Sequence, residues 1–130
     1  MKLHVSQTMN ANPLLELPCA ADTAYKVGQA LTVIGGVAAL ASGTTKPEYI
    51  CMAEKTGVDG GLVPAIAVLP GEIYEAALSA DGAALNVGDK VTIAADGIRV
   101  TATTTSGVAK IVGFPAGTKA VGDPVLIKFD

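Results

Sequence analysis

The amino-acid sequence predicts an all-β protein, either a compact β-sandwich or a partly open, β-tulip-like barrel, with an extended N-terminal arm and at most one short helix. Fifteen Gly and seven Pro are scattered along the 130 residues and mark turns at short intervals. Half of the residues are hydrophobic, but only 4% are aromatic, so the core must consist of small branched side chains. Three similar segments, residues 27–33, 87–93 and 121–127, each begin with a turn and continue as an alternating run.

These three segments share the pattern Val-Gly-Asp/Gln-x-Leu/Val-x-Val/Ile. A Gly followed by a polar residue predicts a turn, and side chains alternate between the two faces of the strand that follows. The predicted inward side chains are Leu31, Val33, Val91, Ile93, Val125 and Ile127. The opposite face carries Thr32, Thr92 and Leu126. An outward Leu126 is either covered by another part of the chain or part of a contact surface.

The length is that of one domain, and we expect residues 24–130 to form a single β-domain. Residues 1–23 differ, because Pro13 and Pro18 interrupt them and their apolar residues follow neither a helical nor a strand period. We interpret this segment as an extended arm that is ordered where it lies on something else. Its apolar content predicts contact with a partner surface through Leu3, Val5, Leu14, Leu15 and Leu17.

The remaining pattern alternates strands with turns. Asp96-Gly97 between two alternating runs is a strong hairpin signal. Pro64 predicts an edge position or a strand start. Residues 72–78 permit two helical turns, but flanking Pro and Gly favour a strand. The predicted strands are residues 29–33, 37–40, 49–53, 63–69, 72–78, 90–94, 98–104, 108–114 and 125–129.

Composition argues against several classes of protein. Nine basic residues spread along a chain of net charge −3 do not predict a nucleic-acid surface. The longest apolar stretch, residues 30–41, contains Gly35 and Gly36 and is too short to cross a bilayer. The first residues lack the apolar segment of a secretory signal, so we expect a cytoplasmic site of synthesis. Cys19 and Cys51 are expected to be buried thiols, with a structural disulfide as the alternative.

No pattern of catalytic or metal-binding residues is recognisable, and we expect no catalytic site, metal or cofactor. His4 is the only histidine, and metal sites normally need three or four converging ligands. Without a central histidine, a nucleophilic serine or cysteine has no base. Five aspartates lie beside or one residue from a glycine, where turn geometry explains them: Asp59, Asp81, Asp89, Asp96 and Asp123.

The order of these pieces resembles the small head-decoration, or capsid cement, proteins of tailed bacteriophages. The resemblance covers residues 24–130 and follows an extended arm. The matching segments are residues 25–31, 47–53, 85–93, 96–100 and 121–127.

The resemblance implies a β-domain without enzymatic activity or cofactor that trimerises on the outer capsid surface and braces it. Its partner would be the major capsid protein, and it would be located in the virion after synthesis in the cytoplasm of a bacterial host. The alternative is a carbohydrate- or surface-binding β-module of a phage fibre or cell-wall protein. Glycan binding commonly uses exposed aromatic platforms, and the tyrosines of the chain, Tyr25, Tyr49 and Tyr74, are few.

Overall fold

The computed structural model describes residues 1–5, 13–103 and 106–129. In these residues the chain forms strands and turns and no helix, which confirms the all-β prediction. The strands are β1 (Lys2–Val5), β2 (Leu14–Pro18), β3 (Ala24–Tyr25), β4 (Ala30–Ile34), β5 (Val37–Leu40), β6 (Tyr49–Cys51), β7 (Lys55–Thr56), β8 (Leu62–Ala67), β9 (Ile73–Leu78), β10 (Lys90–Ile93), β11 (Arg99–Ala102), β12 (Ala109–Gly113) and β13 (Pro124–Phe129).

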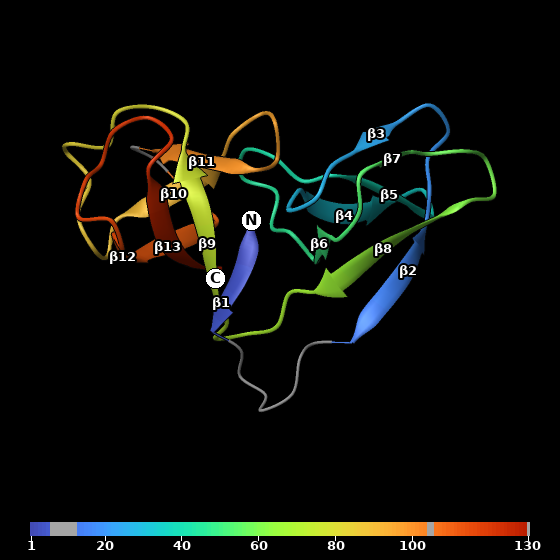
Figure 1. The fold of residues 1–130 in the computed structure, drawn as a ribbon, viewed down its shortest axis with the longest axis horizontal. Helices are drawn as coiled ribbons and strands as arrows, with labels where there is room; N and C mark the ends of the chain where they lie inside the picture. The colour runs from blue at the N-terminus through green and yellow to red at the C-terminus, as the bar shows by residue number, and fades with distance from the viewer. Residues whose placement is uncertain (6–12, 104–105, 130) are drawn as a thin grey trace.

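Five strands close into a barrel in the order β9-β11-β10-β12-β13, because β13 pairs back onto β9 (Figure 1). The pairs are antiparallel except for β9 and β11, which run parallel. β1 lies beside β9, where Leu3 pairs with Tyr74, and β11 pairs further along the same edge, where Val100 meets Leu78. Closure satisfies the strand edges that an open sheet would expose.

The other large unit is a five-stranded antiparallel sheet in the order β2-β8-β6-β4-β5. We call it the second sheet. β3 and β7 form a separate two-stranded ribbon beside it. Figure 1 places the second sheet next to the barrel, and the segment from β8 to β9 links the two. The chain thus forms two β-structures, the barrel and the second sheet, which lie side by side.

Two predictions for the later chain are confirmed, one from an ambiguous segment and one from a strong hairpin signal. The segment at residues 72–78 forms β9, a strand rather than a helical turn. β10 and β11 form the expected hairpin around Asp96-Gly97, with Thr92 opposite Thr101. Asp96 Oδ1 accepts hydrogen bonds from the N–H groups of Ile98 at 2.9 Å and Arg99 at 3.0 Å, which fixes the turn.

The repeated segments begin with turns of one construction. In each, a glycine at positive φ precedes a polar residue whose side chain accepts a hydrogen bond from the N–H three residues earlier. Asp89 accepts from Asn86 and Asp123 from Ala120, both at 2.9 Å. Glu72 repeats the arrangement with Leu69 at 2.9 Å, after Gly71. Sequence comparison missed this fourth turn because Pro70 stands where the other turns have Val.

In the first repeated segment, Val33 was predicted to point inward and Thr32 outward, and both predictions are wrong. Val33 is 38% exposed, whereas Thr32 is buried. The Thr32 hydroxyl donates to Glu48 Oε1 at 2.6 Å, so its polar atom has a partner inside. β6 pairs only with Ala30 and Leu31, and β4 beyond them lacks that cover. The corresponding inward residues of the other two segments are buried as predicted: Val91, Ile93, Val125 and Ile127.

The described parts of the N-terminal segment are strands of this same chain. β1 pairs with β9 of the barrel, and β2 pairs with β8 of the second sheet. The segment is therefore extended, as expected, but its described strands lie on the chain's own two β-structures. Residues 6–12 of the expected arm lie outside the described residues. The apolar spacing did not predict β2, because Leu14 and Leu15 are both exposed and only Leu17 is buried, so the apolar residues do not alternate.

Pro64 lies in an interior strand, contrary to the predicted edge or strand-start position. β8 is flanked by β2 and β6, and Pro64 pairs with Glu16 on the β2 side. The Pro64 carbonyl accepts from the Met52 N–H at 2.9 Å, one residue past the end of β6. The N–H and C=O of a residue in an antiparallel strand face the same neighbour, so the N–H that proline lacks would also have faced β6. It would have faced Met52, so the one ladder bond that is lost lies just past the end of β6.

Two hydrophobic clusters hold the structure together. The larger one fills the barrel and also includes Ala30, Ile50 and Ile66 from the second sheet. The smaller one lies within the second sheet and includes Leu17, Cys19, Tyr25, Leu31, Ala38, Cys51, Val63 and Ala65. Because Ile50 and Ile66 belong to the barrel cluster, the second sheet and the barrel are packed against each other. This contact brings residues of the two structures together at the surface.

Candidate interaction surface

An apolar groove of about 330 Å³ lies where the barrel meets the second sheet. Its position follows from the strand register. Ile50 on β6 pairs with Ile66 on β8, so their side chains share one sheet face, and both belong to the cluster that fills the barrel. β1 is held beside β9 on the barrel side. The side chains that line the groove are Met1, Lys2, Leu3, Val27, Ile50, Met52 and Ile66.

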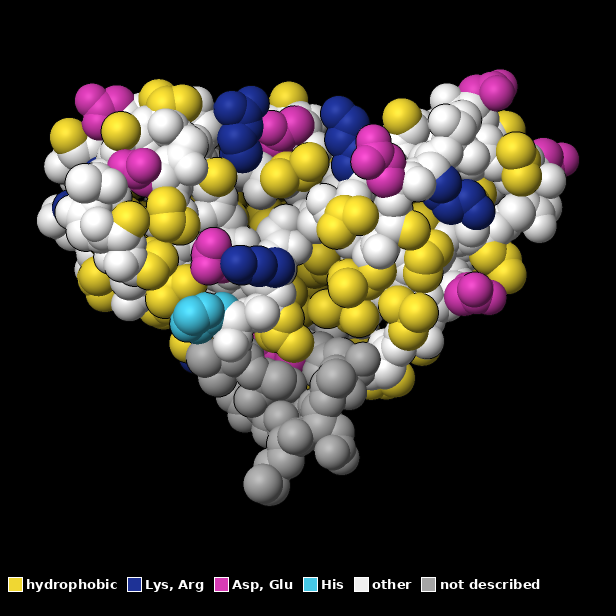
Figure 2. All heavy atoms as spheres, viewed as in Figure 1, with side chains coloured by type: hydrophobic (Ala, Val, Ile, Leu, Met, Phe, Trp, Pro, Cys, Tyr) yellow, Lys and Arg dark blue, Asp and Glu magenta, His cyan; other side chains and the backbone are white. Residues whose placement is uncertain are grey.

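Exposed apolar side chains extend the groove along the second sheet. Leu14 pairs with Ile66, so it lies on the same sheet face, and it is 62% exposed. Met52 and Leu62 are 44% and 45% exposed. Figure 2 shows a broad area of hydrophobic side chains on this face, between the barrel and the outer strands of the second sheet. A continuous apolar area of this kind is typical of an interaction site.

The amino group of Met1 lies at one end of the groove and donates to the carbonyl oxygen of Gly28. Burial lowers the pKa of this amino group to about 6, and the negative charge of Asp96 opposes the shift. A Cβ at Gly28 would lie 2.5 Å from the Met1 nitrogen, so only glycine leaves room for this contact. The turn that carries Val27 and the first strand of the chain are thereby fixed to each other.

A shallow depression of about 470 Å³ continues the groove across the barrel wall. Met1, Lys2 and Val27 line both spaces. Glu75 and Pro124 add the barrel side of the depression. Lys2 and Glu75 form an exposed ion pair with a nitrogen-to-oxygen distance of 3.6 Å, which contributes little stability. The pair is polar and stands between two apolar areas.

The structure distributes the predicted contact residues over several environments. Leu3 lines the groove and packs against the barrel core, while Leu14 extends the groove and Leu15 is 37% exposed. Leu17 is a core residue of the second sheet and is not available to a partner. Leu126 is half-buried on the barrel wall, opposite Glu75 and Gly113. Val5 lies in β1, opposite Ile73.

Sequence reasoning missed most of the groove residues, among them Val27, Ile50 and Met52. A signal for Val27 was present. The valine that opens each repeated turn is apolar although it occupies a turn position, and all three are exposed: Val27, Val87 and Val121. Ile50 and Met52 gave no such signal, because only the packing of two β-structures brings them to Leu3.

The described residues contain no group of three or more His, Cys, Asp or Glu side chains that could hold a metal ion. His4 is exposed on β1. Cys19 and Cys51 are buried free thiols, and Cys51 Sγ donates to the Ala53 carbonyl at 3.1 Å. Burial raises the pKa of the Cys51 thiol, which makes it a poor nucleophile at neutral pH.

Within the described residues, no helix is long and apolar enough to span a membrane. No protein-family model matches the chain, and no curated protein matches its sequence.

Proposed function

We propose that this protein is a structural capsid decoration protein that binds the outer surface of a phage head through the apolar groove and braces the shell. The observation that carries the proposal is the continuous apolar face formed by the groove and its exposed extension at Leu14, Met52 and Leu62. That face lies on a body built of turns and strands. A bracing protein needs such a body and an adhesive face, and it needs no reaction centre.

The proposed partner is the major capsid protein, and the proposed assembly on the shell is a trimer. Many copies on a symmetric lattice combine weak single contacts into strong overall attachment. A modest groove is therefore sufficient for each copy. In this proposal the protein is made in the cytoplasm of a bacterial host and is carried on the outer capsid surface.

The alternative of a carbohydrate-binding module has less support. Tyr25 and Tyr74 are buried, and Tyr49 is half-buried and packs against the smaller hydrophobic cluster. Stacking on a sugar ring needs an aromatic face open to solvent. None of the three tyrosines provides one as a broad exposed platform.

The test of the capsid proposal uses two turn valines as a matched pair. Val27 and Val87 hold the same position in turns of the same construction and are 58% and 63% exposed, but only Val27 lines the groove. We expect Val27→Glu to abolish co-sedimentation with decoration-free capsids of the phage that encodes the protein. Val87→Glu should bind as the unaltered protein does. Circular dichroism checks that both variants are folded.

Two results would overturn the proposal. Failure of the unaltered protein to bind capsids removes the function itself. Equal binding by Val27→Glu and Val87→Glu shows that the groove is not the contact. Native mass spectrometry of the free protein, and image reconstruction of decorated capsids, test the trimer separately.

A further inference from the structure

Three lysine side chains form a row across the outside of the barrel. Lys90 on β10 pairs with Lys110 on β12, and Lys110 pairs with Lys128 on β13. All three are exposed. Directly paired residues of neighbouring strands point to the same face, with Cβ atoms about 4.5–5.5 Å apart. We call Lys90, Lys110 and Lys128 the lysine row.

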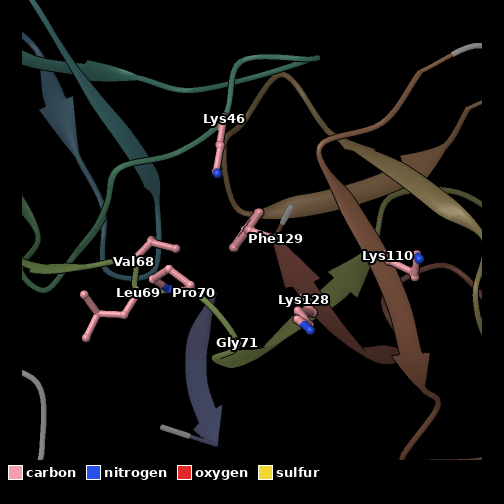
Figure 3. A pocket seen from close by; sticks show the side chains of 8 residues that line it. All are labelled: Lys46, Val68, Leu69, Pro70, Gly71, Lys110, Lys128 and Phe129. Atoms are coloured by element: carbon pink, nitrogen blue, oxygen red, sulfur yellow. The ribbon is translucent and has the colours of Figure 1, made fainter. Parts of the chain in front are cut away.

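The lysine row borders a cleft of about 420 Å³. Lys110 and Lys128 line this cleft together with Lys46, which comes from the segment before β6, and with residues 68–71 between β8 and β9. Figure 3 shows that these lysines come from three separate segments around the cleft, with the Lys110 side chain directed away from Phe129. Positive charge is thus concentrated at one place in a chain whose net charge is −3.

Folding alone does not account for the row. Like charges placed directly opposite each other on neighbouring strands destabilise a sheet. Lysines on edge strands prevent unwanted strand pairing, but β10, β12 and β13 each have a neighbour on both sides in the closed barrel. These positions face solvent, where many uncharged residues would serve a strand equally well. Lys110 and Lys128 therefore face each other as like charges without protecting an edge.

Two carboxylates of the described residues near the row and the cleft, those of Asp89 and Glu72, accept hydrogen bonds from backbone N–H groups of their own turns. Asp89 accepts from the Asn86 N–H at 2.9 Å, and Glu72 accepts from the Leu69 N–H at 2.9 Å and from the Tyr74 hydroxyl at 3.2 Å. Among the residues that the structure describes, no ion pair includes Lys110. Lys110 therefore adds a positive field to the surface at the cleft.

The side chains around the cleft favour carboxylates over nucleic acid. Arginine is the residue best suited to paired contacts with phosphate, and the only arginine of the chain, Arg99, is bound to Asp96 at 2.6 Å. Single-stranded nucleic acid also needs aromatic side chains on which bases stack. Phe129, the aromatic residue in the lining of the cleft, is buried. Each lysine ammonium group donates up to three hydrogen bonds and accepts none, so it can pair with a carboxylate.

We propose that the lysine row and its cleft bind an acidic segment of a partner protein through the Asp and Glu carboxylates of that segment. This inference does not rest on the capsid role, because the site is separate from the apolar groove. Carboxylates placed over the row would relieve the repulsion between its lysines. The binding should therefore weaken steeply as salt screens these charges.

The experiment measures fluorescence anisotropy of a labelled hexaglutamate peptide with the full chain at low ionic strength. Lys110→Glu changes the centre of the row, and Lys26→Glu makes the same change of net charge at an exposed turn outside it. We expect Lys110→Glu to weaken binding about tenfold and Lys26→Glu to change it less than about twofold. Lys110→Glu should remain folded, because it replaces repulsion by attraction, and thermal unfolding checks this.

The remaining outcomes each contradict the proposal. Equal weakening by the two variants means that the peptide responds only to net charge. Unchanged binding by Lys110→Glu means that the row is not the site. Tighter binding of a labelled hexathymidylate than of hexaglutamate identifies a nucleic-acid surface instead, and full displacement of the peptide by inorganic phosphate identifies a small-anion site. Capsid co-sedimentation of Lys110→Glu separates this proposal from the function of the groove.

Discussion

Gln29 stands in its turn where Asp89 stands in another, and each side chain accepts a hydrogen bond from the N–H three residues before it, at 3.4 Å and 2.9 Å. The Gln29 side chain also acts as a hydrogen-bond donor, which an aspartate carboxylate cannot do. Its Nε2 donates to the Asp96 carbonyl at 3.3 Å, and the next residue, Ala30, donates to the Gly97 carbonyl at 2.8 Å. The longer amide thus joins the start of the second sheet to a hairpin of the barrel.

Gln29→Asp tests this link. Aspartate keeps an acceptor for the turn, but it has no donor for the Asp96 carbonyl and places a carboxylate near that oxygen in a buried position. We expect a loss of about 1–3 kcal/mol in the free energy of unfolding, measured by urea denaturation. Asp89→Asn, at the half-buried equivalent, should lose less. Similar losses for both variants would mean that Gln29 acts only within its own turn.

Two glycines separate backbone strain from steric contact. Gly88 has φ of +98° and open space around it, so Gly88→Ala should cost about 1–2 kcal/mol through conformation alone. Gly28 has φ of +84°, and in addition a Cβ there would meet the Met1 nitrogen at 2.5 Å. We expect Gly28→Ala to cost about 1–3 kcal/mol more than Gly88→Ala in the same denaturation experiment. Equal costs would contradict the contact between Met1 and the turn.

The lysine row carries a stability prediction that needs no ligand. Lys110→Glu converts two repulsive cross-strand pairs, with Lys90 and Lys128, into attractive ones. We expect the free energy of unfolding to rise by about 1 kcal/mol at low ionic strength. The gain should shrink in about 1 M NaCl, because salt screens exposed charges. Lys110→Gln should gain less than Lys110→Glu; a loss of stability in both variants would show that the lysine stem packs on the barrel.

Acid should weaken the hairpin between β10 and β11. Burial raises the pKa of Asp96, but hydrogen bonds from the Arg99 and Ile98 N–H groups and from the Arg99 guanidinium outweigh it and hold the pKa below its ordinary value. The stabilisation is therefore complete above the unfolded pKa of about 3.9 and is lost as the pH falls through the lower folded value. The measurement is the difference in unfolding free energy between the unaltered protein and Asp96→Asn.

That difference should favour the unaltered protein at neutral pH and narrow toward about pH 3, because Asp96 is then protonated in the unfolded chain. Asp59→Asn, at an exposed loop position, serves as the control for a general effect of lost negative charge. A difference that stays constant from neutral to acid pH would show that the charge of Asp96 does not contribute.

The strands of the later chain were predictable because local signals agree there. Turn residues flank alternating runs, as at Asp96-Gly97, and the resulting hairpin needs only neighbouring segments. β2 was not predictable from its period, because an outer sheet position lets Leu14 and Leu15 both remain exposed. The prediction that the Val33 side chain points inward was wrong for a similar reason. Whether its face is covered depends on the length of β6, which is another segment of the chain.

The groove and the lysine row lay beyond sequence reasoning for a different reason. Their residues come from segments far apart in the chain, such as Leu3 and Met52, or Lys46 and Lys128. Strand order and register decide which of them meet, and neither follows from local periodicity. The nine basic residues look evenly spread along the sequence, and only the register of β10, β12 and β13 aligns three of them.

The pairing of β9 with β1 on one edge and β13 on the other has a mechanical consequence. Both outer strands run antiparallel to β9, so they run parallel to each other on its two sides. A pull on Lys2 and Phe129 in opposite directions along the strands would load both hydrogen-bond ladders in shear, because those bonds lie perpendicular to the strands. The bonds would then have to break together rather than one after another, and the structure would resist tension applied through β1 and β13.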